Sequence, residues 1–129
     1  MADNIPGDLK YTREHEWARA QGNVVVVGVT DHAQTSLGDV VYVELPKVGA
    51  KVTAGASVGT IESTKAVSEL FSPLSGTVVK VNDSLTDNPS QVNDDPYGAG
   101  WLVEIEPSDP KQVDGLLDAA AYAELVKNA

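Results

Sequence analysis

The stretch that decides the fold of this chain is Ser57-Val58-Gly59-Thr60-Ile61-Glu62-Ser63-Thr64-Lys65-Ala66-Val67-Ser68-Glu69-Leu70-Phe71. Two runs typical of β-strands, 57–62 and 66–71, flank the short turn Ser63-Thr64-Lys65. The pattern predicts a β-hairpin with Lys65 at its tip and its amine in water. An exposed amine on a rigid turn has the geometry that an enzyme needs to attach a long cofactor arm.

Outward from the hairpin, the chain alternates between short strand patterns and turn residues. A helix is predicted over 31–37, capped by Thr30 or Asp31 and ended by Gly38. The segment 51–55 reads as a turn, and 84–100 as irregular with one helical turn. Helical periodicity begins at Asp109, and Asp118 can cap a final helix. Strands are predicted over 9–11, 16–20, 23–30, 40–45, 77–81 and 101–106, with the second and third joined at Gln21-Gly22.

Length and composition fit one small globular domain. The chain has 129 residues, with a predicted core over about 9–106 and a C-terminal helical extension over about 109–128. Aromatic residues make up 5% of the chain, so the core must consist mostly of Val, Ala, Leu and Ile. Many short strands separated by Gly, Pro and Asn favour a mostly-β sandwich or flattened barrel.

Charge and missing motifs exclude several classes of function. The formal net charge is -10, which argues against nucleic acid and anionic membranes and favours docking on basic protein surfaces. The chain has no cysteine, and it contains neither a Gly-x-Ser-x-Gly elbow nor a phosphate-binding glycine loop. The N-terminal residues lack the features of an export or transit signal. We therefore expect a non-catalytic, cytoplasmic monomer.

Two histidines raise the question of a metal site. His15 and His32 lie 17 positions apart and have no cysteine to join them, so no metal site is predicted. Their surroundings instead predict a partly buried, hydrogen-bonded His15 and an exposed His32 at the start of a helix.

Several blocks around the hairpin resemble the H protein family of the glycine cleavage system. The family pattern is close to Glu-Ser-Val-Lys-Ala followed by Pro-x-Ser-Gly, and this chain has Thr64 in place of the Val and Gly76 at the end of the second motif. Glu69 stands where the family often has Asp. Further similar blocks are Tyr11-Thr12, His15-Glu16-Trp17, Gly28-Val29-Thr30-Asp31-His32-Ala33-Gln34, Leu37-Gly38-Asp39-Val40-Val41-Tyr42-Val43-Glu44-Leu45-Pro46 and Asn93-Asp94-Asp95-Pro96-Tyr97-Gly98-Ala99-Gly100-Trp101.

The resemblance implies both a fold and a cofactor. The fold would be a lipoyl/biotinyl-type barrel-sandwich hybrid of two small antiparallel sheets, with a short internal helix and a C-terminal helix. Lipoic acid would be attached covalently to Lys65. The residues that form the hairpin around the attachment site would be Glu62, Ser63, Thr64 and Ala66.

The resemblance also implies partners. A pyridoxal-phosphate glycine decarboxylase would pass an aminomethyl group to the arm, and an aminomethyltransferase would move it to tetrahydrofolate. A dihydrolipoyl dehydrogenase with FAD and NAD would reoxidise the arm. A lipoate ligase, or an octanoyltransferase with lipoyl synthase, would install it. The chain would be a carrier that contributes positioning rather than catalytic groups.

The aminomethyl cargo is cationic and labile, and the loaded arm of this family is thought to fold into a surface cleft. By motif position, the shielding residues would be Glu14, His15, Glu16 and Glu69. Two alternatives stay open: a lipoate depot or relay protein, and a lipoyl domain of another complex. Thr64 and Ala66 argue against a biotinyl domain, which usually has Met on both sides of the lysine.

Overall fold

Two antiparallel β-sheets form the body of the protein in a computed structural model, which describes residues 4–128. The larger sheet has six strands in the order β1-β2-β3-β9-β8-β5, and the smaller sheet has three in the order β4-β6-β7. This arrangement confirms the predicted mostly-β fold. The strands are β1 (Lys10–Tyr11), β2 (Glu16–Gln21), β3 (Val24–Val29), β4 (Val40–Glu44), β5 (Lys51–Val52), β6 (Ser57–Ser63), β7 (Val67–Phe71), β8 (Gly76–Val81) and β9 (Val103–Pro107).

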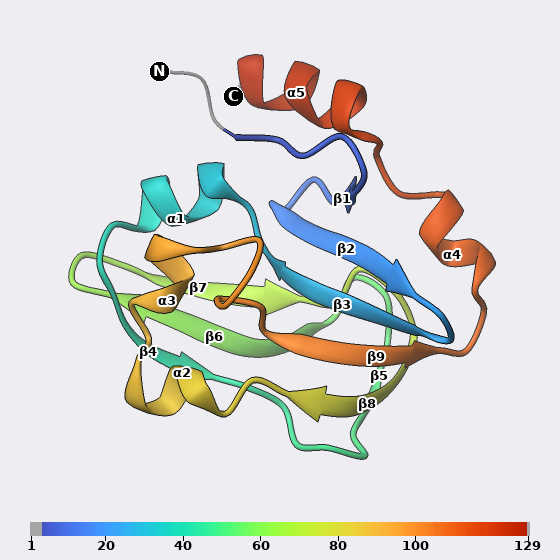
Figure 1. The fold of residues 1–129 in the computed structure, drawn as a ribbon, viewed down its shortest axis with the longest axis horizontal. Helices are drawn as coiled ribbons and strands as arrows, with labels where there is room; N and C mark the ends of the chain where they lie inside the picture. The colour runs from blue at the N-terminus through green and yellow to red at the C-terminus, as the bar shows by residue number, and fades with distance from the viewer. Residues whose placement is uncertain (1–3, 129) are drawn as a thin grey trace.

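Within residues 4–128, five short helices lie around the sheets. They are α1 (Asp31–Leu37), α2 (Ser84–Asp87), α3 (Gln91–Asp94), α4 (Lys111–Asp114) and α5 (Ala119–Lys127). Figure 1 shows α1 beside the free end of the β6–β7 hairpin, and α5 at the top of the view above the N-terminal segment and β1. No helix in the described part of the chain is long and apolar enough to cross a membrane.

The core divides into two clusters. The larger cluster fills the space between the sheets with aliphatic side chains such as Val27, Ile61 and Leu70. The smaller one joins the N-terminal strands to α5 through Tyr11, Trp17 and Tyr122. Aliphatic packing between the sheets agrees with the Val-rich composition, whereas the few aromatic rings are concentrated under the C-terminal helix.

The capping signals predicted both of the longer helices. Thr30 caps α1 by accepting a hydrogen bond from the Ala33 N–H, and α1 ends at Gly38. Asp118 caps α5 in the same way, through the Ala121 N–H. A side-chain acceptor at the start of a helix satisfies amide groups that have no partner within the helix, which is why these starts are readable from sequence.

The structure corrects four local predictions. The predicted turn 51–55 contains β5, which pairs with the start of β8. The predicted irregular segment 84–100 contains two helical turns, α2 and α3. The first hairpin turns at 22–23 rather than at 21–22, because Gln21 pairs with Val24. Finally, the last strand begins at Val103, two residues later than predicted.

Candidate functional site

Lys65 lies at the tip of the β6–β7 hairpin, and its side chain is exposed, as the sequence predicts. The turn is fixed from inside by Ser63, which is 7% exposed. The Ser63 hydroxyl oxygen accepts hydrogen bonds from the Lys65 N–H at 3.3 Å and from the Ala66 N–H at 3.1 Å. The Ser63 N–H in turn donates to the Ala66 carbonyl at 2.8 Å. Ser63 therefore sets the shape of the turn that presents the lysine.

The segment between α1 and β4 supports the hairpin tip from outside. The Thr64 N–H donates to the Asp39 carbonyl at 3.1 Å. Gly38 has φ 76°, and a Cβ atom at this position would lie 3.3 Å from the Lys65 Cε atom. Glycine suits position 38 for two reasons. It leaves room for the lysine stem beside the backbone, and it readily adopts a positive φ, which residues with a Cβ atom rarely do. Asn93 holds this segment by donating to the Gly38 carbonyl at 2.8 Å and accepting from the Val40 N–H at 2.9 Å.

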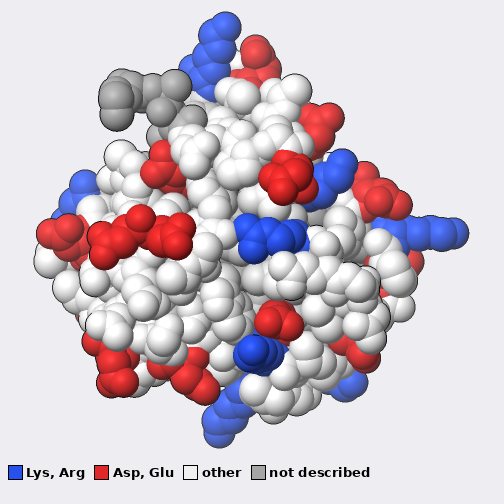
Figure 2. Space-filling model, viewed as in Figure 1, with Lys and Arg blue, Asp and Glu red and all other residues white. Residues whose placement is uncertain are grey.

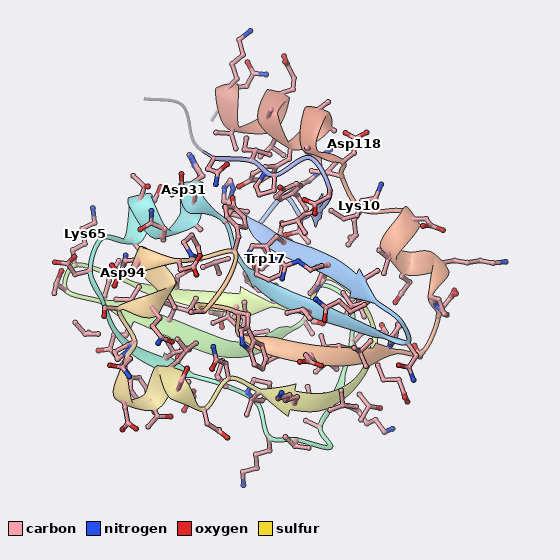
Figure 3. The ribbon with its side chains drawn as sticks, viewed as in Figure 1. Lys10, Trp17, Asp31, Lys65, Asp94 and Asp118 are labelled. Carbon is pink, nitrogen blue, oxygen red and sulfur yellow. The ribbon has the colours of Figure 1, made fainter. Side chains whose placement is uncertain are left out.

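The other predicted hairpin residues are exposed around the lysine. Glu62, Thr64 and Ala66 all lie at the surface. Glu62 pairs with Val67 on one side and with Tyr42 on the other, so these three form one cross-strand row. Figure 2 shows acidic side chains gathered on the left of the displayed face, where Figure 3 labels Lys65. The amine thus stands in an acidic, open environment.

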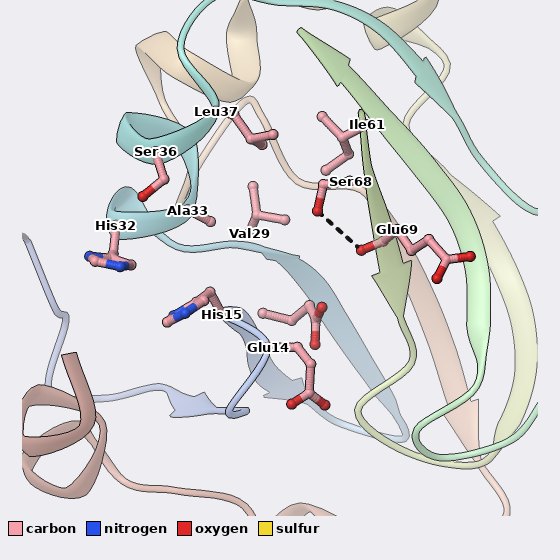
Figure 4. Close-up of a pocket in the computed structure, with 11 residues that line it drawn as sticks. Glu14, His15, Val29, His32, Ala33, Ser36, Leu37, Ile61, Ser68 and Glu69 are labelled. Carbon is pink, nitrogen blue, oxygen red and sulfur yellow. Dashed lines mark hydrogen bonds between the residues drawn. The ribbon is translucent and has the colours of Figure 1, made fainter. Parts of the chain in front are cut away.

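A cleft of about 270 Å³ opens between α1, the segment joining β1 to β2, and β7 (Figure 4). All four residues predicted to shield the cargo border it: Glu14, His15, Glu16 and Glu69. The remaining lining residues come from β3, α1 and the hairpin: Val29, His32, Ala33, Ser36, Leu37, Ile61 and Ser68. The cleft therefore combines an apolar floor with carboxylates and imidazoles at one end.

Glu16 is the most buried acid of the cleft, with 2% of its surface exposed. Burial raises the pKa of its carboxyl group from 4.5 to about 7, although hydrogen bonds from Thr12 and from the Phe71 N–H oppose the rise. The Thr12 hydroxyl donates to Oε1 at 2.6 Å, and the Phe71 N–H approaches Oε2 at 3.4 Å. Glu16 can therefore change protonation near neutral pH.

His15 adopts an unusual backbone conformation at the edge of the cleft. Its φ is 70°, which is uncommon for a residue other than glycine. Its Nδ1 atom lies 2.7 Å from the Tyr122 hydroxyl oxygen, and its ring centre lies 4.7 Å from that of His32. His15 is partly buried and hydrogen-bonded, as predicted. The prediction of an exposed His32 is wrong, because its ring packs beside His15 and is partly buried.

Ser68 and Glu69 border the cleft differently. Side chains alternate between the two faces of a strand, and Ser68 pairs with Ile61, another residue of the cleft. Figure 4 shows the Ser68 side chain on the cleft side of β7, whereas the Glu69 carboxylate points to the other side. Glu69 therefore borders the cleft without directing its charge into it.

The lysine and the cleft share a boundary at the end of α1. Ser36 and Leu37 line the cleft, and the next residue, Gly38, lies beside the Lys65 stem, which a Cβ atom at position 38 would meet at 3.3 Å. On the hairpin, Ser68 follows Lys65 by three residues, which corresponds to roughly 10 Å along a strand. An arm attached to Lys65 would thus start beside the cleft. Among residues 4–128, no group of His, Asp or Glu is placed to hold a metal ion.

Sequence reasoning missed three contributors to this site: Ser68, His32 and Tyr122. Paired residues on neighbouring strands point to the same face of a sheet. The pairing of Ile61 with Ser68 across the hairpin therefore indicates Ser68, and not Glu69, as the inward residue. No local signal indicates Tyr122, because it reaches His15 across 107 residues of sequence.

Comparison with known proteins agrees with this geometry. A family model described as "Glycine cleavage H-protein" matches residues 9–129. The chain is 80% identical to the glycine cleavage system H protein of Myxococcus xanthus (strain DK1622), over the full length of both chains. It is 63% identical to that of Anaeromyxobacter sp. (strain K), covering 95% of this chain and 96% of the relative.

A solved structure supports the same relationship. The fold superimposes on the crystal structure of a glycine cleavage system H protein from Mycobacterium marinum with a TM-score of 0.86. The two chains are 48% identical, and the match covers 93% of this chain and 97% of the other. The predicted family is thereby confirmed: the chain belongs to the glycine cleavage H-protein family.

Proposed function

We propose that this chain is the lipoyl carrier of a glycine cleavage system and that Lys65 is its attachment site. The observation that carries the proposal is an exposed lysine at a rigid hairpin tip, adjoining a cleft that contains the buried Glu16 carboxyl group and two partly buried imidazole rings. Proteins of this family carry covalent lipoyl-lysine and are not themselves catalysts. The whole chain, residues 1–129, would act as a single carrier domain.

The residues at the site fit a lipoyl group. An exposed primary amine can form the amide link, and the lysine stem already lies against Gly38 at the rim of the cleft. When attached, the lipoyl group supplies a strained disulfide that accepts electrons and a carbon fragment together. The contribution of the chain is to hold the arm, to exclude water and to place charge opposite the cargo.

The cleft residues have distinct roles in the proposal. Glu14 and Glu16 offer carboxylates to a cationic aminomethyl group, and a charge-assisted hydrogen bond is stronger than a neutral one. His15 closes the end of the cleft beside them. Glu69, whose carboxylate points away in Figure 4, contributes less to shielding than Glu16.

The partners follow from membership of the glycine cleavage system. The loaded arm would meet the glycine decarboxylase, the aminomethyltransferase and the dihydrolipoyl dehydrogenase in turn. A lipoate ligase, or an octanoyltransferase with lipoyl synthase, would modify Lys65 first. A monomeric state, a cytoplasmic location and the absence of nucleic-acid and membrane partners stay predictions. A cleft built for the cargo favours this function over a lipoate depot or relay, which needs only the lysine.

The test combines a modification assay with a functional assay. After incubation with a lipoate ligase, peptide mass mapping should place the added mass on Lys65 alone, and Lys65→Arg should accept none. Lys51→Arg and Lys80→Arg are the matched controls, because Lys51 in β5 and Lys80 in β8 belong to the larger sheet and contact Thr77 and Trp101 respectively. The lipoylated chain should support glycine–bicarbonate exchange by the decarboxylase. Modification of Lys51 or Lys80 instead would overturn the assignment.

A further inference from the structure

We propose that Tyr122, in the C-terminal helix, is a positioning residue that holds His15 and the first turn of α1 in place at the cleft. The inference rests on the proposed function, because the cleft matters only if the loaded arm enters it. It extends that function by giving α5 a role: through Tyr122, α5 keeps the cleft closed around the cargo.

Tyr122 is itself fixed by packing. Its side chain is fully buried, and its ring stacks on Tyr11 with a centroid distance of 4.6 Å and an interplanar angle of 9°. Trp17 and Leu9 belong to the same core cluster. The ring therefore has a defined position, so its hydroxyl group can act as a fixed anchor for other residues.

The hydroxyl group joins two walls of the cleft. Its oxygen lies 2.7 Å from the His15 Nδ1 atom and 2.7 Å from the Thr30 Oγ1 atom. His15 belongs to the segment between β1 and β2, while Thr30 is the N-cap of α1 and accepts a hydrogen bond from the Ala33 N–H at 3.2 Å. One buried group thus connects the His15 wall to the helix that provides the opposite wall.

The backbone at His15 shows that this residue is held against its preference. A φ of 70° is disfavoured for a residue with a Cβ atom, and it persists only where surrounding contacts enforce it. The His15 N–H donates to the Thr12 carbonyl at 3.2 Å, and the His15 carbonyl accepts from the Thr30 N–H at 3.0 Å. The Tyr122 hydroxyl fixes the ring in the same place, so backbone and side chain are both anchored.

The Tyr122 hydroxyl gives the His15 ring a hydrogen bond that Tyr122→Phe would remove. The Tyr122 oxygen and the His15 Nδ1 atom lie 2.7 Å apart, and which of them donates depends on the imidazole tautomer. In the bond between Tyr122 and Thr30, either hydroxyl group can be the donor. The anchoring of the ring therefore rests on the two 2.7 Å contacts and not on their direction.

The experiment compares Tyr122→Phe with Tyr11→Phe in the full-length lipoylated chain. Both substitutions remove one phenol hydroxyl from the same buried cluster, and the Tyr11 hydroxyl donates to the Pro6 carbonyl, away from the cleft. Nitrogen-15 NMR of the imidazole rings reports the hydrogen bond at the His15 Nδ1 atom. The decay of methylamine-loaded carrier, measured without the transferase, reports how well the cleft holds its cargo. Thermal melting measures the stability that each variant loses.

In the wild type and in Tyr11→Phe, we expect the same nitrogen-15 shift at His15 Nδ1 and equal decay rates. In Tyr122→Phe, we expect a changed Nδ1 shift and decay that is several-fold faster, even where the melting temperatures of both variants fall equally. An unchanged Nδ1 shift or an unchanged decay rate in Tyr122→Phe would overturn the proposal, as would equal effects in Tyr11→Phe. If the wild-type carrier itself cannot be loaded from glycine, the proposed function fails, and the comparison of Nδ1 shifts still tests the anchoring by Tyr122.

Discussion

Glu16 combines two requirements that conflict in the empty carrier. Its carboxyl group is buried, which disfavours the charged form, yet a cationic cargo would be held best by a charged carboxylate. A cation entering the cleft supplies the missing opposite charge and so favours ionisation. In the proposed function, this arrangement would make the cleft selective for a positively charged group over a neutral one of the same size.

Glu16→Gln should therefore weaken retention of the cargo. A hydrogen bond to a charged group contributes about 1.5–3 kcal/mol, so its loss should speed the decay of methylamine-loaded carrier by about tenfold or more. Glu69→Gln should have a smaller effect, because its carboxylate points away from the cleft. Glu62→Gln, on the exposed face of the hairpin, serves as the control. Decay at the wild-type rate in Glu16→Gln would remove the cleft assignment while leaving the carrier function intact.

The same residue predicts a pH dependence of stability in the unmodified chain. The pKa of Glu16 rises from 4.5 to about 7 on folding, so the folded state binds the proton more tightly. Its contribution to stability is complete below about pH 4.5, decreases as the pH rises towards 7 and is lost above that. At about 1.36 kcal/mol per pKa unit, the total change is about 3 kcal/mol at most.

Urea unfolding at a series of pH values tests this prediction. Glu16→Gln cannot ionise, so its free energy of unfolding should decrease less than that of the wild type between pH 4.5 and 7.5. The free energy of unfolding of the variant, relative to that of the wild type, should therefore increase by about 2–3 kcal/mol over that range. Parallel curves for the two proteins would show that Glu16 ionises normally in the folded state.

Among the elements, the hairpin and the two capped helices were the most predictable. Ser63, Thr64 and Lys65 interrupt two strand patterns, and Thr30 and Asp118 carry the capping chemistry that starts α1 and α5. The sequence does not predict β5, because two residues show no periodicity and pair only because β8 offers an edge. Segment 84–100 is predicted to be irregular because its Asn, Asp and Pro residues favour turns, although packing of Leu85 and Val92 makes two helical turns.

The hairpin tip predicts how a ligase recognises the chain. Gly38 and Asp39 support the tip from outside the hairpin, so a peptide covering residues 60–70 lacks that support. Ordering even two residues costs about 2–4 kcal/mol, and the peptide should therefore be modified about 100-fold less efficiently than the folded protein. The measurement is kcat/KM for lipoylation of the two substrates. Equal values would show that the ligase reads only the local sequence.

At the scale of the whole molecule, the cleft depends on parts of the chain that no local pattern connects. The position of His15 depends on Tyr122, and the tip depends on Asn93 through Gly38. The sequence placed Glu14, His15, Glu16 and Glu69 together through family resemblance, and the structure adds the contacts that hold the cleft. Such contacts join residues far apart in sequence, so they become visible only when the sheets and α5 are packed together.

Net charge predicts how the carrier meets its partner enzymes. The chain has a formal net charge of -10, and acylation of Lys65 removes one positive charge and gives -11. Attraction to basic docking surfaces should raise the association rate at low ionic strength. Between about 0.01 M and 0.15 M salt, the Debye length falls from about 30 Å to about 8 Å, so this attraction is largely screened.

We therefore expect the KM of the decarboxylase for the lipoylated carrier to rise about fivefold or more over that salt range, with little change in kcat. Free lipoamide has no charge, so its use by the same enzyme should not change with salt and serves as the control. A KM that rises for both substrates would show that salt acts on the enzyme alone. A KM that stays constant for the carrier would show that docking depends on shape and apolar contact near the hairpin, where Tyr42 and Val67 are exposed, rather than on the acidic surface.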